Sequence, residues 1–258
     1  MLRLAKVKGG SHLYGLNNAD SDHDFYEIVA LSPSEIAFDI INLRHGDAVG
    51  PGEVDDHEID VVTLCTGYMD TMWGLELLFA DPEADYEVAP EWNRLRDMRK
   101  NLCTPALVQQ TYYRLQNCVS RYATYIRPTE EKEGEWRVAE NFSSKPVDAR
   151  NLAHAYRMAI QCMNYITTRD LFGSTFKLDR DAYARLKENV VTIEDVKECL
   201  QTLVGLGLLK SQGVGISGEF YESPETKAIF WEIVNSTTVA AIGTESPAIE
   251  YFQSTHEA

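Results

Sequence analysis

The chain has 258 residues, 44% of them hydrophobic, so it is long enough for one large domain or two of ordinary size, each with a packed core. Its 40 Asp and Glu residues outnumber its 24 Lys and Arg residues, and the resulting formal charge of −16 disfavours a protein that grips long nucleic acid through many phosphates. No apolar run reaches the roughly 18 residues that cross a bilayer, and the N-terminal MLRLAKVKGG is too short and too charged for a signal peptide. We therefore expect a globular protein without a membrane partner that stays in the cytoplasm.

The predicted elements begin with a mixed α/β segment. Residues 3–8 alternate in polarity and end at Gly9-Gly10-Ser11, which predicts a short strand followed by a turn and a single helical turn. Residues 24–31 are rich in β-branched and aromatic side chains and predict a second strand. Residues 44–57 combine Gly, Pro and acids, typical of a loop or hairpin tip, and residues 58–64 predict a third strand.

Helical spacing dominates the rest of the chain. Thr104-Pro105 is a favourable helix start, with Thr as the N-cap and Pro in the first turn. We expect an α+β fold in which a mixed-sheet core (1–100) precedes a mainly helical C-terminal domain (101–258). Helices are predicted over residues 67–80, 104–126 and 147–171, with further helix starts at Thr192 and Ser223 and a polar connector at 128–146.

Five cysteines are spread along the chain, and no two form a C-x-x-C pair. This pattern indicates neither a disulfide framework nor a zinc knuckle. We expect reduced thiols that mostly pack in the interior. The cysteines are Cys65, Cys103, Cys118, Cys162 and Cys199.

Two aspartates stand where the second predicted strand begins. Asp22 and Asp24 are two residues apart, so a strand directs both carboxylates to one face, with Cα atoms about 6–7 Å apart. Their repulsion must be offset by a cation, by raised pKa values or by full solvation, and hard divalent ions suit such oxygen ligands. In the third predicted strand Asp60 is flanked by apolar residues, and Glu58 shares its face. We predict a metal site of Asp22, Asp24 and Asp60, with Glu58 as the alternative third ligand.

Each of these features also has a plainer interpretation. The DSDHD stretch is typical of a solvated turn. An EF-hand beginning at Asp20 fails, because its sixth position is Phe25 and its twelfth is Leu31. No G-K-[ST] follows Gly9-Gly10-Ser11, so the turn is not a Walker A loop. Only the combination of features favours a nucleotide site.

The pattern G-S-x-x-Y-G-x-x-x-x-x-S-D-x-D at residues 10–24, followed about 36 residues later by a strand acid, resembles the DNA polymerase beta-type nucleotidyltransferase superfamily. More narrowly, it resembles a bacterial and phage branch of predicted nucleotidyltransferases. The acidic strand followed by E-L-L-F at residues 76–79 is similar to that branch. So is the helix motif D-x-K-x-x-x-H-x-x-R, carried here by Asp148, Arg150, His154 and Arg157. Arg150 replaces the usual Lys, which exchanges a point charge for a planar fork.

The resemblance implies transfer of a nucleoside monophosphate from an NTP, ATP among the candidates, to an acceptor with release of pyrophosphate. It implies Mg²⁺, or Mn²⁺, held by Asp22, Asp24 and Asp60. The acceptor is an RNA or DNA 3′ hydroxyl such as a tRNA end, a protein side chain or a small molecule. Two alternatives stay open: a non-catalytic nucleotide-binding or interaction protein on the same fold, and an accidental motif in another α+β domain. The nucleotide-binding residues that the resemblance implies are Gly10, Ser11, Tyr14, Arg150, His154 and Arg157.

Overall fold

The chain is described by a computed structural model in two compact units. The first unit contains the described residues up to Leu102, apart from Met72, together with residues 231–236 without 234. The second contains Met72 and the described residues from Pro105 to Gln212. The described residues are 1–17, 21–31, 52–64, 72–102, 105–128, 136–138, 149–212, 231–233 and 235–236, of which 122–128 and 136–138 are described by backbone alone.

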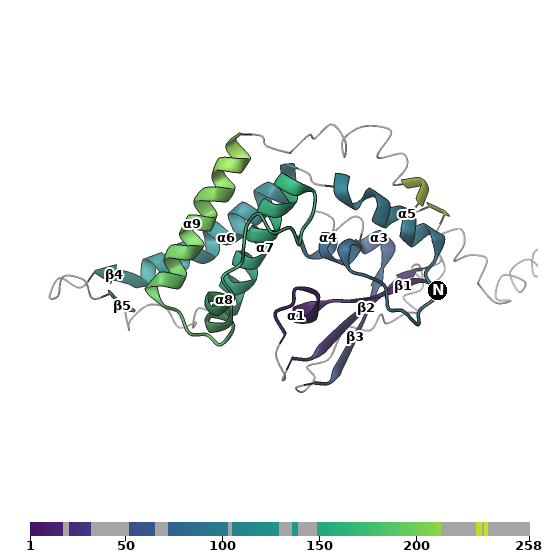
Figure 1. Cartoon of the computed structure of the whole chain (residues 1–258), viewed down its shortest axis with the longest axis horizontal. Coiled ribbons are helices and arrows are strands. Elements are labelled where there is room, and N and C mark those ends of the chain that lie inside the picture. Colours follow the sequence, from purple (N-terminus) through teal and green to yellow (C-terminus); the bar gives the residue numbers. More distant parts are fainter. Residues whose placement is uncertain are drawn as a thin grey trace, which may run out of the picture. The chain divides into compact units, whose positions relative to one another are not determined.

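A mixed three-stranded sheet organises the first unit (Figure 1). The strand order is β1-β2-β3, with β1 antiparallel to β2 and β2 parallel to β3. The first two strands confirm the sequence predictions, and the sheet with its helices is an α+β arrangement. The strands are β1 (Leu2–Lys8), β2 (His23–Ala30) and β3 (Val54–Asp60).

The third strand is displaced from its predicted range of 58–64. It begins at Val54, inside the stretch predicted as a loop tip, because these acidic residues pair in register with β2. It ends at Asp60, whose carboxylate accepts hydrogen bonds from the backbone N–H groups of Val62 and Thr63, both at 3.1 Å. This side-chain cap starts the short helix α3 (Val61–Thr63), so the prediction of strand beyond Asp60 was wrong.

Helices of the first unit lie beside the sheet, with α3, α4 and α5 on one side of it (Figure 1). Helix α4 falls inside the predicted range 67–80, of which residues 67–71 lie outside the described residues. Helix α5 was not predicted, because it is polar apart from the buried Trp92 and Leu95. The bounds are α1 (Gly10–Leu13), α4 (Met72–Phe79), α5 (Pro90–Met98) and the 3₁₀ helix η2 (Arg99–Asn101).

The segment after α4 follows the free edge of β1. Glu83 N–H donates to the carbonyl of Lys6 and Ala89 N–H donates to that of Leu4, each at 2.9 Å. Glu232, far along the chain from this sheet, also belongs to this unit, where it accepts a hydrogen bond from Arg94 at 2.9 Å. The unit therefore includes a residue from the range 101–258 that was expected to form the C-terminal domain.

Long helices build the second unit. Helices α6, α7 and α9 contact one another, and α8 packs on α7. The predictions of helices near residues 104–126 and 147–171 and of a start at Thr192 are confirmed, whereas Thr104 and Ser223 lie outside the described residues. The predicted connector contains part of a small hairpin. The bounds are α6 (Pro105–Tyr125), β4 (Ile126–Pro128), β5 (Trp136–Val138), α7 (Ala149–Thr168), α8 (Arg180–Lys187) and α9 (Ile193–Ser211).

Three of the cysteines are described, and all three are free thiols. Cys162 and Cys199 are fully buried, and Cys118 is half-buried. Burial raises the pKa of the Cys199 thiol to about 12, so it stays protonated at neutral pH. Cys65 and Cys103 lie outside the described residues. Among the helices described, none combines the length and apolar character needed to span a bilayer.

Candidate metal and phosphate site

The parallel register of β2 and β3 places Asp24 beside Asp55. Partners in a parallel pair share a face of the sheet, and neighbouring strands lie about 4.8 Å apart. His57 follows two residues later on that face, and its Nε2 lies 3.2 Å from Asp55 Oδ2. Ligand atoms of Asp24, Asp55 and His57 all lie within 4.8 Å of one another. Donors around a single ion with bonds of about 2.1–2.5 Å are separated by at most about 4–5 Å, so the three side chains suit one shared cation.

The imidazole of His57 is held in place by aromatic packing. The Tyr26 ring stacks on it with centroids 4.7 Å apart and an interplanar angle of 10°. Trp73 of α4 in turn meets Tyr26 edge to face at 5.4 Å. Gly9 leaves room for this stack, because a Cβ at that position would lie only 2.2 Å from Tyr26 Cε2. The orientation of His57 is therefore fixed by strand β3, by the Tyr26 ring stacked on it and by Trp73 of α4, which packs against Tyr26.

Negative charge accumulates on this face of the sheet. Burial raises the pKa of Tyr26, and the charges of Asp24, Asp55 and Glu76 raise it further. Two carboxylates about 5 Å apart repel each other by about 3 kcal/mol at an effective dielectric constant of 20. The protein has to offset this repulsion, and a divalent cation between the carboxylates does so most directly.

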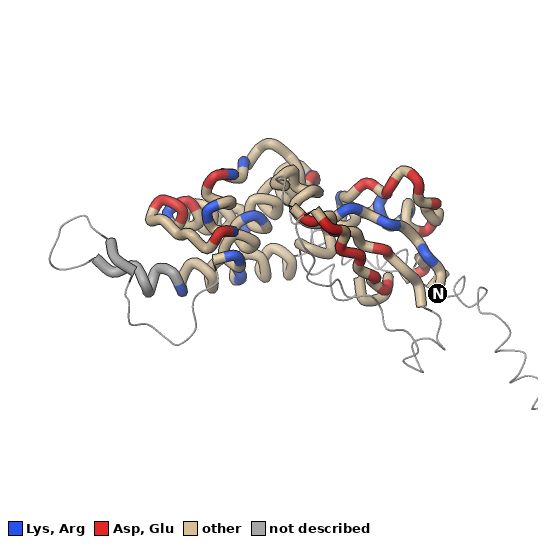
Figure 2. Tube along the Cα trace, turned by 90° about the horizontal axis from the view of Figure 1, so that it is seen from below, with Lys and Arg blue, Asp and Glu red and all other residues tan. Residues whose placement is uncertain are grey.

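Basic side chains of β1 form ion pairs on the opposite face of the sheet. Lys6 Nζ pairs with Asp56 Oδ1 at 2.7 Å, and Arg3 Nε lies 3.3 Å from Glu27 Oε1. Figure 2 shows Lys and Arg positions along the strand that starts at the N-terminus, with Asp and Glu positions on the neighbouring segments. Because strand side chains alternate, these cations lie across the sheet from Asp55. Their pairing neutralises the far face.

The glycine turn lies directly against the carboxylate of Asp24. Gly10 has a φ of +57°, and a Cβ there would lie 1.5 Å from Asp24 Oδ2, so only glycine fits. Gly9 N–H donates to the Asp24 carbonyl at 2.9 Å, which ties the turn to β2. Ser11 is 9% exposed, and its Oγ has no hydrogen-bond partner among the described residues. A buried hydroxyl without a partner is suited to bind a polar ligand, and Ser11 directly follows Gly10, the residue that borders Asp24.

Tyr14 connects this turn to α4. Its hydroxyl donates to the carboxylate of Glu76, a residue that is 1% exposed. The bond accounts for a buried acid in an otherwise apolar helix and holds α1 against α4. Tyr14 thus positions the turn through Glu76.

Asp22 lies just before β2 and is half-buried. The N–H of the next residue, His23, donates to the Glu53 carbonyl at 2.8 Å, so the strand geometry already holds there. Alternation along the strand then places Asp22 on the same face as Asp24. Among the described residues, the ligand atoms that lie within 4.8 Å of one another belong to Asp24, Asp55 and His57 and do not include Asp22, so its assignment as a ligand stays a prediction.

Asp60 is not brought to this cluster. It is in register with Val29, five positions beyond the Asp24 and Asp55 pair, which corresponds to about 16 Å along the strand and to the opposite face. Its Oδ2 caps α3, and Leu31 N–H lies 3.4 Å from its Oδ1. Its carboxylate therefore has a local structural function. The alternative, Glu58, is three positions from Asp55 and likewise faces away.

Asp55 and His57 were missed by sequence reasoning, because the acid-rich stretch 52–57 was interpreted as a loop. The available signal lies in residues 54–60, V-D-D-H-E-I-D, where Asp55 and His57 are two positions apart and would share one face of a strand. Recognising it required the strand to begin at Val54.

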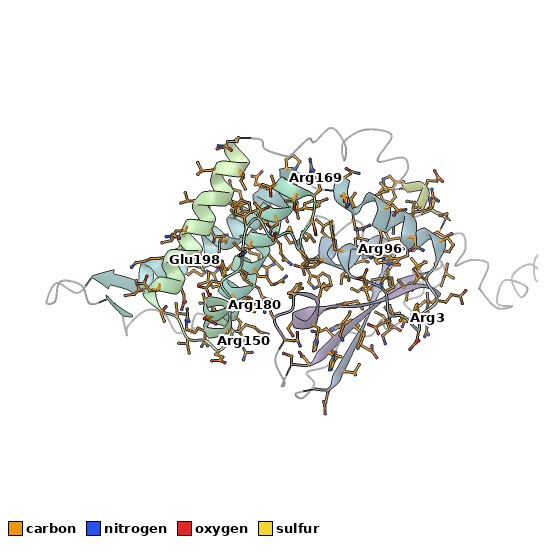
Figure 3. The ribbon with its side chains drawn as sticks, viewed as in Figure 1. Arg3, Arg96, Arg150, Arg169, Arg180 and Glu198 are labelled. Carbon is orange, nitrogen blue, oxygen red and sulfur yellow. The ribbon has the colours of Figure 1, made fainter. Side chains whose placement is uncertain are left out.

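The predicted basic residues on α7 belong to the second unit. Arg150 is exposed and its Nε donates to the Lys187 carbonyl at 3.3 Å (Figure 3). His154 is half-buried, and Arg157 is 3% exposed with Nη1 donating to Gln161 Oε1 at 2.8 Å. The spacing aligns the three along the helix, but their exposures differ widely.

Comparison with known proteins found a similar solved structure and no matching family model or curated protein. Among solved structures, the chain is similar to a nucleotidyltransferase-like protein from Exiguobacterium sibiricum 255-15, with a TM-score of 0.29 and 10% identity over 91% of this chain and 84% of that one. A similarity this low carries no weight for function, which has to be inferred from the site itself.

Proposed function

We propose that the chain is a metal-dependent nucleotidyltransferase that moves a nucleoside monophosphate from an NTP to an acceptor and releases pyrophosphate. One observation carries the proposal: the Gly10-Ser11 turn lies in van der Waals contact with Asp24, beside Asp55 and His57. A site for phosphate and a site for cations are thereby contiguous. The motif resemblance of residues 10–24 to the polymerase beta-type superfamily supports the same function.

The donor set suits the chemistry. When bound, divalent cations stabilise the charge that develops on the attacking and leaving oxygens of phosphoryl transfer. Asp24 and Asp55 would hold the cations, and Asp22, two residues before Asp24, is proposed as a further carboxylate ligand. His57 would complete the set from the same face.

The turn would bind the triphosphate. The Ser11 hydroxyl and the backbone N–H groups after Gly10 are suitable donors for phosphate oxygens, and the buried position excludes competing water. Since the Gly10 α-carbon touches Asp24, a phosphate bound there is within reach of a cation held by the cluster. Tyr14, through its bond to Glu76, would keep the turn in position.

The acceptor hydroxyl belongs to an RNA or DNA end, a protein side chain or a small molecule. Arg150 of the second unit, whose side chain is exposed, is proposed to bind anionic groups of the acceptor, whereas Arg157 is 3% exposed and bonds to Gln161 within its own helix. The acidic balance of the chain favours a short contact with an acceptor over a long nucleic-acid track.

The test is a labelling assay with purified protein. Each α-labelled NTP is incubated with the protein, Mg²⁺ or Mn²⁺, and total RNA or cell lysate. We expect label in one class of acceptor with the wild type, and a loss of about 100-fold or more in Asp24→Asn and Asp55→Asn, because each removes a charged ligand of the reacting centre.

Two further variants serve as matched controls. Asp56→Asn removes the adjacent acid, which pairs with Lys6 on the opposite face, and is expected to keep transfer. Asp60→Ala removes the cap of α3, so it should lower the free energy of unfolding by about 1 kcal/mol and leave transfer in place. Full activity in Asp24→Asn and Asp55→Asn, with a folded protein, would refute the assignment.

A further inference from the structure

We infer that the site selects a first-row transition-metal ion over Mg²⁺, because its third donor is the imidazole of His57. The inference rests on the proposed function only in taking Asp24, Asp55 and His57 as one cation site. Mg²⁺ requires oxygen ligands and keeps several waters, whereas imidazole nitrogen suits transition metals. A set of two carboxylates and one imidazole therefore favours ions such as Mn²⁺ and Zn²⁺.

The geometry of His57 is that of a fixed donor. It lies in register with Tyr26, whose ring stacks on it, and its Nε2 is 3.2 Å from Asp55 Oδ2. Its side chain is 24% exposed and that of Asp55 is 12% exposed, so both are partly withdrawn from water without being sealed off. A surface histidine rotates freely, but this one is held by a ring on one side and a carboxylate at its edge.

The layers behind the donors are also occupied. Trp73 packs edge to face against Tyr26. At position 9 only glycine leaves room for the Tyr26 ring, because any Cβ there would clash with it. Partners of this kind orient metal-binding imidazoles and are typically important for affinity. On the other side Gly10 fits against Asp24, and the next residue, Ser11, has a buried hydroxyl without a hydrogen-bond partner among the described residues. The site is thus built around the donor atoms from both strands and the turn.

Metal binding to the full chain, without nucleotide, tests the inference. Isothermal titration of metal-free protein with Mn²⁺, Zn²⁺ and Mg²⁺ is expected to give an affinity for Mn²⁺ at least about tenfold above that for Mg²⁺. In His57→Asn this ratio should fall to within about threefold. In His57→Asp, which creates an all-oxygen set of ligands, the affinity for Mg²⁺ should rise relative to that for Mn²⁺. His23→Asn, which removes a histidine that stacks on His12, is the control and should keep the wild-type ratio.

A spectroscopic measurement on the wild type does not depend on how the variants fold. Pulsed electron paramagnetic resonance of the Mn²⁺-loaded protein should show coupling to a histidine nitrogen. Absence of this coupling, or a wild-type Mn²⁺ to Mg²⁺ ratio below about threefold, would overturn the inference. Because no NTP is present, a failed transfer assay leaves these results intact, and transfer supported equally by Mg²⁺ and Mn²⁺ with no nitrogen coupling would refute only the selectivity.

Discussion

A single glycine links the two halves of the proposed site. Gly10 has a left-handed backbone, and the position of its missing Cβ coincides with Asp24 Oδ2. Any side chain there has to displace the carboxylate that we assign to cation binding. The residue type at position 10 is thus dictated by two physical constraints, one of backbone and one of space.

Gly10→Ala is expected to abolish metal binding. The φ of +57° costs the variant about 1 kcal/mol of stability, and the new methyl group pushes the Asp24 carboxylate out of place. Titration with Mn²⁺ and thermal melting measure the two effects separately.

Gly52→Ala is the matched control. Gly52 has a φ of +74°, but a Cβ there meets nothing within 4 Å. It should lose a similar amount of stability and keep the metal-dependent rise in melting temperature. If Gly10→Ala binds metal as Gly52→Ala does, then Asp24 is not a ligand.

At the scale of elements, the junction of β3 and α3 shows how a side chain ends a strand. The sequence predicts strand through Leu64, because Val61 and Val62 favour β structure. The Asp60 carboxylate instead accepts two backbone N–H groups and begins a helix. An acid in an apolar run, interpreted from sequence as a metal ligand, is here explained by capping.

The start of α9 is a second capping device and gives a pH-dependent prediction. Thr192 and Asp195 form a capping box, and Arg185 Nη2 lies 2.6 Å from Asp195 Oδ1. Burial acts to raise the pKa of Asp195, but hydrogen bonds from Arg185 and Thr192 outweigh it, and the pKa is lowered. The carboxylate therefore stabilises the fold above its unfolded pKa of about 3.9, and this stability is lost as the pH falls through the lower folded value.

We expect Asp195→Asn to lower the free energy of unfolding by about 1–2 kcal/mol near pH 7, because the charged hydrogen bond from Arg185 is weakened. The difference from wild type should shrink as the pH falls below about 3.9, because the wild-type acid is then protonated too. Urea titrations at a series of pH values measure it. Glu194→Gln, an exposed neighbour paired with Lys197, should change stability little at any pH. A pH-independent difference would contradict the role given to the Asp195 charge.

At the scale of the whole molecule, the net charge of −16 lowers the affinity of the chain for polyanions such as RNA. We expect weak binding to a single-stranded RNA when divalent cations are removed by EDTA, with a plot of log affinity against log salt no steeper than about −2, because few phosphates are neutralised. Fluorescence anisotropy across a range of salt concentrations measures the slope. A steep slope would show an extended basic track and favour a long nucleic-acid acceptor.

The sequence predicted local features well. The strands β1 and β2, the turn at Gly10 and the cap at Thr192 depend on interactions between residues a few positions apart. Such interactions leave patterns in a short window, namely alternation, glycine placement and a Thr at a helix start.

Only the tertiary structure decided which acids meet. The segments that carry Asp24 and Asp55 are about 30 residues apart, and a shift of one residue in their register would turn every side chain of β3 to the other face. Nothing in the local pattern fixes that register. The sequence alone therefore determined the glycine turn and one face of acids beside it. The pairing of β2 with β3 placed Asp55 and His57 on that face and left Asp60 at the opposite face, where it caps a helix. The tertiary structure decided this because strand register is set by contacts between distant segments.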